Sequence, residues 1–296
     1  MFRLGGGGAD SDVMLDMIIR CGGKEKTAFV FFNTGIEYRA TLEHLAFLEH
    51  KYDIKIEKIR ATKSIPVSVK ECGVPFLNKE VSSNIYTLQS KGFKWEDESY
   101  DILSEKYPHC KVPLRWWCNC GRGTEKASSR FMIKRHKYLK EFLMKNPPQF
   151  KISSKCCDYA KKNVSHKYER DNKFDLKCMG IRKAEGGIRS VQYKNCFTET
   201  GSIDQFRPVF WLRDKDMDEY CKYYSVVHSK CYTKYGFKRT GCAGCPFNLN
   251  IEKDLLAICK YEPAMYKLAH NVFDCSYKYT QAYYRFREAM ESQGDK

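Results

Sequence analysis

The sequence predicts an α/β fold in which a Rossmann-like parallel sheet is flanked by helices, followed by a helical, cysteine-bearing C-terminal extension. Two observations predict it. A glycine run leads directly into an apolar-periodic, helical segment. Further on, a short apolar run at 27–32 is followed by a helical segment at 37–52 and by an alternating segment at 54–59. Strand, helix and strand in that order indicate parallel pairing, because a helical crossover must return the chain to the same end of the sheet.

The amino-terminal segment is expected to place backbone N–H groups around an anion. Residues 1–4 would form a very short strand, 5–8 are all glycine, and Asp10 or Ser11 would cap a helix that includes 13–19. A glycine-rich turn that leads into a helix presents free N–H groups and the positive end of the helix dipole to a phosphate. The alternative is a flexible terminus with no ligand.

The remaining segments suggest one nucleotide-binding domain over 1–240 and a C-terminal Cys-x-x-Cys and helical extension over 241–296. A further strand is expected within 176–182 and a helix at 214–223, and two tyrosine-rich helical stretches end the chain. The stretch of about 61–150 is basic, aromatic and without clear periodicity, so we expect it to be an irregular insertion.

Composition excludes several classes of protein. The 296 residues have a mass of 34.7 kDa, 43% apolar residues and 15 cysteines, and 52 Lys and Arg against 36 Asp and Glu give a net charge of +16. Such a chain is neither disordered nor collagen-like, because it has enough apolar material for a core. We expect no membrane span and no secretory signal, and therefore a cytoplasmic protein with mostly reduced cysteines. The oligomeric state stays open.

Four cysteines have the spacing of a metal centre. Cys156 and Cys157 are adjacent, and Cys242 and Cys245 form a Cys-x-x-Cys turn. Four thiolates suit an iron–sulfur cluster, and a four-cysteine zinc site also fits. A second group has no standard ligand spacing, so a structural role is expected although zinc stays open. It comprises His109, Cys110, Cys118 and Cys120.

Two short motifs resemble those of ATP pyrophosphatases and sulfonucleotide reductases. The segment from Gly6 to Ser11 resembles their PP-loop, Ser-Gly-Gly-x-Asp-Ser, with Gly6 in place of the first serine. Asn33-Thr34-Gly35 resembles their Asp-Thr-Gly turn after the second strand. The resemblance implies the adenine nucleotide alpha-hydrolase-like fold. It also implies nucleotide contacts at Gly6, Gly7, Gly8, Ala9, Asp10, Ser11, Asn33, Thr34 and Gly35.

The cysteines and their neighbours resemble the phosphoadenosine phosphosulfate or adenosine phosphosulfate (PAPS/APS) reductase family, in its iron–sulfur-bearing and phage-type branch. The likeness includes the segment that begins Gly180-Ile181-Arg182. It implies a [4Fe-4S] cluster held by Cys156, Cys157, Cys242 and Cys245. It also implies basic contacts to phosphate or sulfate from Arg182 and Arg189, and further contacts from Lys161, Lys162 and Arg239.

The resemblance implies an oxidoreductase that binds APS or PAPS and receives electrons from a thioredoxin-like reductant. Reductases of this family end in a cysteine-bearing tail, whereas residues 281–296 contain no cysteine. The catalytic residue is therefore unassigned, with Cys72 and Cys275 as weak candidates. We expect Cys275 to be a buried thiol on a helix face.

Two other functions stay open. The first is an ATP pyrophosphatase that uses ATP, with or without Mg²⁺, to adenylylate or thiolate a nucleic acid, as in DNA phosphorothioation or tRNA thiolation. The positive charge and the interleaved aromatic residues favour such a polyanionic partner. The second is a non-catalytic nucleotide or redox sensor that keeps the cluster.

Overall fold

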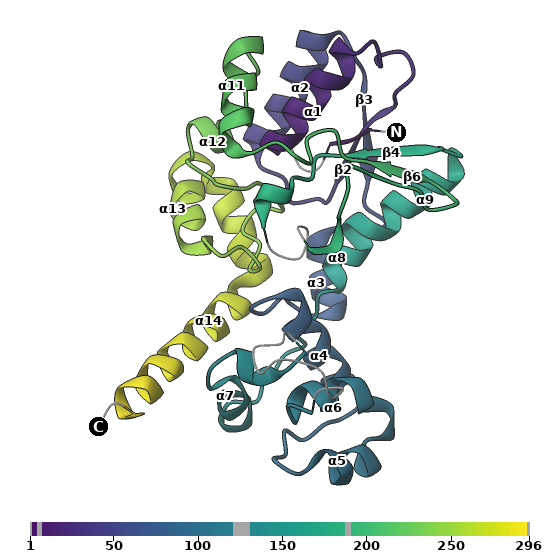
Figure 1. Cartoon of the computed structure of the whole chain (residues 1–296). Coiled ribbons are helices and arrows are strands. Elements are labelled where there is room, and N and C mark those ends of the chain that lie inside the picture. Colours follow the sequence, from purple (N-terminus) through teal and green to yellow (C-terminus); the bar gives the residue numbers. More distant parts are fainter. Residues whose placement is uncertain (1, 5–7, 121–130, 187–190, 295–296) are drawn as a thin grey trace. The chain divides into compact units, whose positions relative to one another are not determined.

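A computed structural model describes residues 2–4, 8–120, 131–186 and 191–294 of the chain (Figure 1). The chain divides into two compact units. The first unit comprises Met1–Ile65, Cys157–Gly244 and Glu252–Ala269. The second comprises Pro66–Cys156, Cys245–Ile251 and His270–Lys296. The sequence suggested a division at 240 and 241, but the second unit combines most of the expected insertion with the last helix.

The first unit is built on a six-stranded sheet of order β3-β2-β1-β4-β6-β5. All neighbouring strands are parallel except β5 and β6, so the predicted fold class is confirmed. The strand order reverses between β1 and β4, and such a switch point is where parallel sheets bind ligands beyond the carboxyl ends of their strands. The strands are β1 Phe2–Leu4, β2 Phe29–Asn33, β3 Ile56–Arg60, β4 Leu176–Met179, β5 Phe197–Thr198 and β6 Asp204–Phe206.

Helices cover both faces of this sheet, as Figure 1 shows. On β2, Phe29 and Phe31 pack with α1 (Ala9–Arg20) and α2 (Arg39–Tyr52), and Val30 and Phe32 pack against α9 (Asn163–Asp171). The continuous apolar run at β2 is therefore explained by burial on both faces. Among its described residues, this unit also contains the helices η3 Asp158–Lys162, η4 Lys183–Glu185, α11 Asp214–Tyr224, α12 Lys230–Thr233 and α13 Ile251–Tyr261.

The start of α1 differs from the sequence prediction. Neither Asp10 nor Ser11 is the N-cap, because α1 begins at Ala9 and Gly8 is the capping residue, with extended backbone angles. The backbone N–H of Ser11 donates to the Gly8 carbonyl over 2.8 Å. The helix therefore starts at the end of the glycine run. Asp10 and Asp12 lie in its first turn, where negative charge interacts favourably with the helix dipole.

The second unit is helical, although the sequence predicted an irregular insertion for most of it. Its apolar and aromatic side chains converge on one core that includes Phe76, Trp117 and Phe142. Short helices with little periodicity of their own are stabilised by this shared burial. The helices are α3 Ile65–Cys72, α4 Lys79–Ser90, α5 Tyr100–Lys106, η1 Pro108–Cys110, α6 Lys111–Trp117, η2 Ile133–Arg135, α7 Leu139–Lys145 and α8 Lys155–Cys157, with part of α14 Pro263–Gly294.

Two further sequence expectations concern this unit and the helices as a whole. Cys110 is fully buried within the aromatic core, which agrees with a structural role for that thiol. Across the described residues, no helix is both long and apolar enough to span a bilayer.

Candidate functional site

The amino end of α1 lies directly against the turn that follows β4. A Cβ atom on Gly180 would lie 3.1 Å from the backbone nitrogen of Ser11 and 3.2 Å from the carbonyl oxygen of Asp10. Only a residue without a side chain lets the two backbones approach this closely without displacement. The first turn of α1 is therefore seated at the switch point between β1 and β4, and its N–H groups face the carboxyl edge of the sheet.

Arg182, which the resemblance predicted to contact phosphate or sulfate, lies at this edge with its guanidinium facing two carboxylates. Its Nε donates to Asp10 Oδ1 over 2.8 Å and its Nη1 to Asp214 Oδ1 over 2.7 Å. The side chain is only 12% exposed. Burial raises the pKa of Asp10, while the nearby Arg182 charge opposes the rise and Glu185 adds to it. An anionic ligand at this edge would compete with Asp10 for Arg182.

The other predicted basic contacts are more exposed or lie outside the described residues. Arg239 is 67% exposed and approaches Glu185, with Nη2 3.3 Å from the Glu185 carbonyl oxygen. Lys162 pairs with Asp158 over 2.8 Å on the same helical turn and is also exposed. Gly6, Gly7 and Arg189 lie outside the described residues.

The turn after β2 is rigid and largely buried. Gly35 has a φ of +84°, and a Cβ atom there would lie 2.7 Å from Ser64 Cβ. Asn33 Oδ1 accepts the Gly35 N–H over 2.8 Å. Thr34 is completely buried, and its N–H and Oγ1 both donate to Glu37 Oε1, over 3.0 and 2.7 Å. Asn33, Thr34 and Gly35 thus form a fixed surface beside the switch point.

A buried polar cluster joins this turn to two of the predicted cluster ligands. Burial raises the pKa of the Cys242 thiol, and the Lys161 charge opposes this, as does a hydrogen bond with Thr34. Glu37 and Cys157 are the other charged or ionisable groups that act on Cys242. Burial also raises the pKa of Glu37, which Thr34 and Lys161 oppose. Lys161 is therefore the cation of this cluster, and Cys157 and Cys242, far apart in sequence, lie close enough to interact.

The backbone carries the same connection. The N–H of Ala243 donates to the carbonyl oxygen of Ile36 over 2.9 Å. The start of the Cys-x-x-Cys segment is therefore fixed to the turn after β2, within the first unit.

The four cysteines can hold a metal centre only if their side chains lie close together. Cys157 and Cys242 belong to the first unit, whereas Cys156 and Cys245 belong to the second. In the described ranges, no three His, Cys, Asp or Glu side chains gather closely enough to hold a single metal ion. A [4Fe-4S] cluster needs four thiolates around a larger body. The partly exposed Cys157 and the buried Cys242 fit two of these positions, because a bound metal cluster would favour the Cys242 thiolate that burial disfavours.

The two weak candidates for a catalytic cysteine both lie in the second unit. Cys72 ends α3 and is partly buried. Cys275 lies on α14 and is exposed, so the expectation of a buried helix-face thiol was wrong for it. Partial desolvation nevertheless raises the pKa of Cys275, which disfavours the thiolate form.

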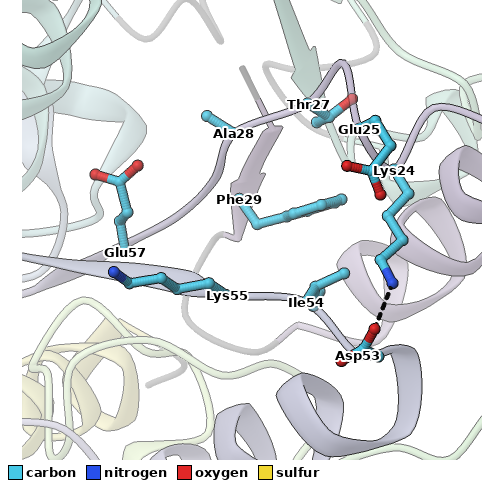
Figure 2. Close-up of a pocket in the computed structure, with 9 residues that line it drawn as sticks. All are labelled: Lys24, Glu25, Thr27, Ala28, Phe29, Asp53, Ile54, Lys55 and Glu57. Carbon is cyan, nitrogen blue, oxygen red and sulfur yellow. Dashed lines mark hydrogen bonds and ion pairs between the residues drawn. The ribbon is translucent and has the colours of Figure 1, made fainter.

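An open hollow lies at the opposite edge of the sheet (Figure 2). It is formed by residues that lead into β2 and β3, among them Thr27, Phe29 and Lys55, and the Lys24–Asp53 ion pair of 2.9 Å closes one side. Because these residues precede their strands, the hollow lies at the amino edge and does not coincide with the α1 site.

Sequence reasoning missed several residues that shape the site. Asp214 shares Arg182 with Asp10, and Glu262 accepts hydrogen bonds from the backbone N–H groups of Arg39 and Ala40 at the start of α2, over 2.8 and 3.1 Å. Glu37 supports Thr34. Of these three carboxylates, only Glu37 lies near its partner in the sequence, three residues after Thr34. Asp214 and Glu262 come from distant segments, so no local pattern indicated them.

Comparisons with known proteins agree with this arrangement. Residues 3–85 match the family model described as the phosphoadenosine phosphosulfate reductase domain. This stretch includes the start of α1 and the turn after β2. An uncharacterized protein of Methanocaldococcus jannaschii is 32% identical over 136 residues, which are 46% of this chain and 26% of that protein. The chain thus spans about a quarter of the length of this curated relative.

A solved structure also aligns with most of the chain. The phosphoadenylyl-sulfate reductase of Candida auris, crystallised as a phosphate complex, covers 81% of this chain and 79% of its own, at 13% identity and a TM-score of 0.41. The similarity to a named family comes from the amino-terminal match. Within residues 3–85 the chain is similar to the phosphoadenosine phosphosulfate reductase domain.

Proposed function

We propose that this protein binds an adenylyl nucleotide, APS, PAPS or ATP, at the carboxyl edge of its sheet, and reduces or transfers sulfur. The observation that carries the proposal is the close approach of the first turn of α1 to Gly180 at the switch point. That approach directs helix N–H groups at a position where a phosphate would be stabilised by the helix dipole. The family match over residues 3–85 covers the same turn.

The basic residues have distinct roles in this proposal. Arg182 would exchange part of its contact with Asp10 for a phosphate or sulfate oxygen, which suits a planar, bidentate donor. Lys161 lies in the buried cluster with Glu37 and Cys242 and supplies positive charge there. Arg189 and Arg239 would add further contacts to the anion, and Lys162 would lie at the margin.

We further propose that Cys156, Cys157, Cys242 and Cys245 hold a [4Fe-4S] cluster. When bound, such a cluster supplies electron-transfer chemistry. The chain's own contribution is a desolvated setting. Cys242 is buried, Thr34 makes a hydrogen bond with its sulfur, and Lys161 offsets the negative charge of thiolates. A thioredoxin-like protein is the proposed electron donor.

A second candidate function is an ATP pyrophosphatase that acts on a nucleic acid. One stretch favours it: residues 106–155 contain 13 Lys and Arg but only two acidic residues. A segment this basic, with the exposed Phe131 within it, has the composition that binds a polyanionic strand. In this case the adenylyl group activates an oxygen of the nucleic acid, with Mg²⁺ on the triphosphate, and pyrophosphate is released.

The experiment that separates these functions measures products from anaerobically purified protein. Sulfite release from APS or PAPS with a thiol reductant supports the reductase, and the Arg182→Gln variant should lose it. Pyrophosphate release from ATP that depends on added tRNA or DNA supports the second candidate. Saturable nucleotide binding without either product would leave a non-catalytic sensor, and no nucleotide binding would overturn the proposal.

The cluster has its own test, which does not need activity. Protein purified without oxygen should contain about four iron and four acid-labile sulfide atoms per chain. The Cys242→Ser and Cys157→Ser variants should lose them, whereas Cys259→Ser, at an exposed position on α13, should retain them. Stoichiometric zinc without sulfide would show a zinc site instead.

A further inference from the structure

A buried carboxylate on α1 holds two histidines outside the nucleotide and cysteine sites. Asp12 has no exposed surface. Its Oδ1 lies 2.9 Å from His44 Nε2 on α2, and its Oδ2 lies 2.9 Å from Nδ1 of His228, which follows α11. A carboxylate can only accept, so both histidine nitrogens that face it carry protons. This fixes the orientation of the His228 ring.

The second nitrogen of His228 faces a thiol. His228 Nε2 lies 3.4 Å from Cys221 Sγ on α11, and the imidazole bridges Cys221 and Asp12. The His228 side chain is 24% exposed and Cys221 is partly exposed, so small molecules can reach the pair. A nucleophile within hydrogen-bond reach of a base that a third group orients is the arrangement of an activated thiol.

Charge favours a protonated His228. Burial lowers the pKa of His228, but its hydrogen bonds with Asp12 and Cys221 and their charges outweigh this and raise the pKa to about 10. An imidazolium beside sulfur stabilises the thiolate. Other titratable or charged groups on the surrounding elements include Asp16, Arg20, His44, Lys51, Tyr52, Tyr220, Tyr224 and Tyr232, and α11 also carries Asp218, Glu219, Lys222 and Tyr223.

Asp16 and Tyr232 have partners of their own. Asp16 accepts from Arg20, Tyr52 and Tyr220 over 2.6 to 2.9 Å, so its charge is compensated without Cys221. Tyr232 contacts His228 only through the rings, whose centroids are 6.0 Å apart, and its hydroxyl pairs with Thr240. Within the described residues no metal-binding group includes Asp12, His228 or Cys221. The arrangement therefore fits a hydrogen-bonded nucleophile better than a metal site.

We propose that Cys221 is a nucleophilic modification site for hydroperoxides, in which His228 holds the proton and Asp12 is a positioning residue. The Cys221 thiolate attacks the terminal peroxide oxygen. The S–O bond forms as the O–O bond breaks, and the departing alkoxide or hydroxide takes the proton from His228. Sulfur is oxidised by two electrons to a sulfenic acid, and the peroxide is reduced to an alcohol or water.

The test measures reactivity at individual cysteines of the full-length protein. Short pulses of iodoacetamide between about pH 6 and pH 8, followed by isotopic labelling and mass spectrometry, give a rate constant for each thiol. Cys259, exposed on α13, is the internal reference, and Cys231, completely buried, reports unfolding. Dimedone trapping after hydrogen peroxide treatment measures the sulfenic acid at Cys221.

At about pH 6 we expect Cys221 to react about tenfold faster than Cys259, because an unpaired thiol is then almost fully protonated. Over this range the Cys221 rate should rise less steeply with pH than the Cys259 rate, because His228 Nε2 lies 3.4 Å from the Cys221 sulfur. His228→Gln should remove the rate advantage of Cys221 and its dimedone label, and Asp12→Asn should reduce both. Tyr232→Phe is the matched control and should keep both.

Two outcomes would overturn the proposal. One is a Cys221 rate that rises with pH in parallel with that of Cys259 in the unaltered protein. The other is a His228→Gln variant in which Cys231 stays protected and the Cys221 rate is unchanged. If His228→Gln unfolds, as Cys231 labelling would reveal, the pH profile of the unaltered protein decides the question alone.

Discussion

Arg182 Nε donates to Asp10 Oδ1 over 2.8 Å, which joins the turn after β4 to the first turn of α1. Both residues were predicted to contact a phosphate, but in this structure the Arg182 guanidinium and the Asp10 carboxylate form an ion pair with each other. An arginine held in this way is oriented before a ligand arrives, and the ligand must replace a carboxylate contact. Nucleotide affinity should therefore depend on both residues and on pH.

Arg182→Gln should weaken binding of AMP, PAPS or ATP roughly ten- to hundredfold, because a charge-assisted hydrogen bond contributes about 1.5–3 kcal/mol. Isothermal titration calorimetry measures the change. Arg213→Gln is the control: this arginine is exposed and pairs with Asp216 near the start of its own helix. Equal affinities for the two variants would remove Arg182 from the nucleotide site.

Asp10→Asn should change how stability depends on pH. The folded pKa of Asp10 is raised by burial, so its ionised form destabilises the native state above that pKa. The unaltered protein should therefore gain stability relative to Asp10→Asn as pH falls through the raised pKa toward the ordinary value of 3.8. Urea unfolding of both proteins across this window measures the difference. If the unaltered protein instead loses stability relative to Asp10→Asn as pH falls, the Arg182 charge has a larger effect on Asp10 than burial does.

Gly35→Ala should destabilise the first unit more than Gly22→Ala does. Both glycines have a positive φ, +84° and +75°, so both substitutions incur left-handed backbone strain of about 1 kcal/mol. Only at Gly35 would the new methyl group lie 2.7 Å from Ser64 Cβ; at Gly22 nothing lies within 4 Å. Thermal unfolding measures the stability of both variants. Equal losses of stability would mean that the turn after β2 accommodates the methyl group without additional strain.

Glu262→Ala should cost about 1–2 kcal/mol, the usual effect of losing a helix N-cap. The side chain of the N-cap residue Tyr38 makes no capping hydrogen bond. Instead, the Glu262 carboxylate accepts hydrogen bonds from the backbone N–H groups of Arg39 and Ala40. Urea unfolding gives the free energy, and amide exchange should speed up in the first turn of α2. Glu43→Ala, at a more exposed ion pair on α2, should change stability by less than about 1 kcal/mol.

Local patterns predicted the elements of the sheet well. The apolar run at 27–32 became β2, the alternation at 54–59 became β3, and the helical segments at 37–52 and 214–223 became α2 and α11. These patterns succeed because periodicity records which face of one element is buried. The 61–150 stretch had no such pattern, since its short helices are stabilised by a core shared with α14.

The site was predictable only where its chemistry is local. The start of α1 and the glycine of the turn after β2 each depend on a few neighbouring residues, so their place at the carboxyl edge could be inferred. Even there, the prediction of Asp10 or Ser11 as the N-cap of α1 was wrong, because the helix begins at Ala9 and Gly8 is its N-cap.

By itself, the sequence determined the parallel sheet, the helix that follows the glycine run and the residue types at the carboxyl edge of the sheet. The tertiary structure decided which groups meet: Arg182 with Asp10 and Asp214, and Cys221 with His228 and Asp12. Backbone conformation and amphipathic burial depend on near neighbours in the chain. The partner of a charge depends on which distant segments the fold brings within a few ångströms, and no local pattern encodes that approach.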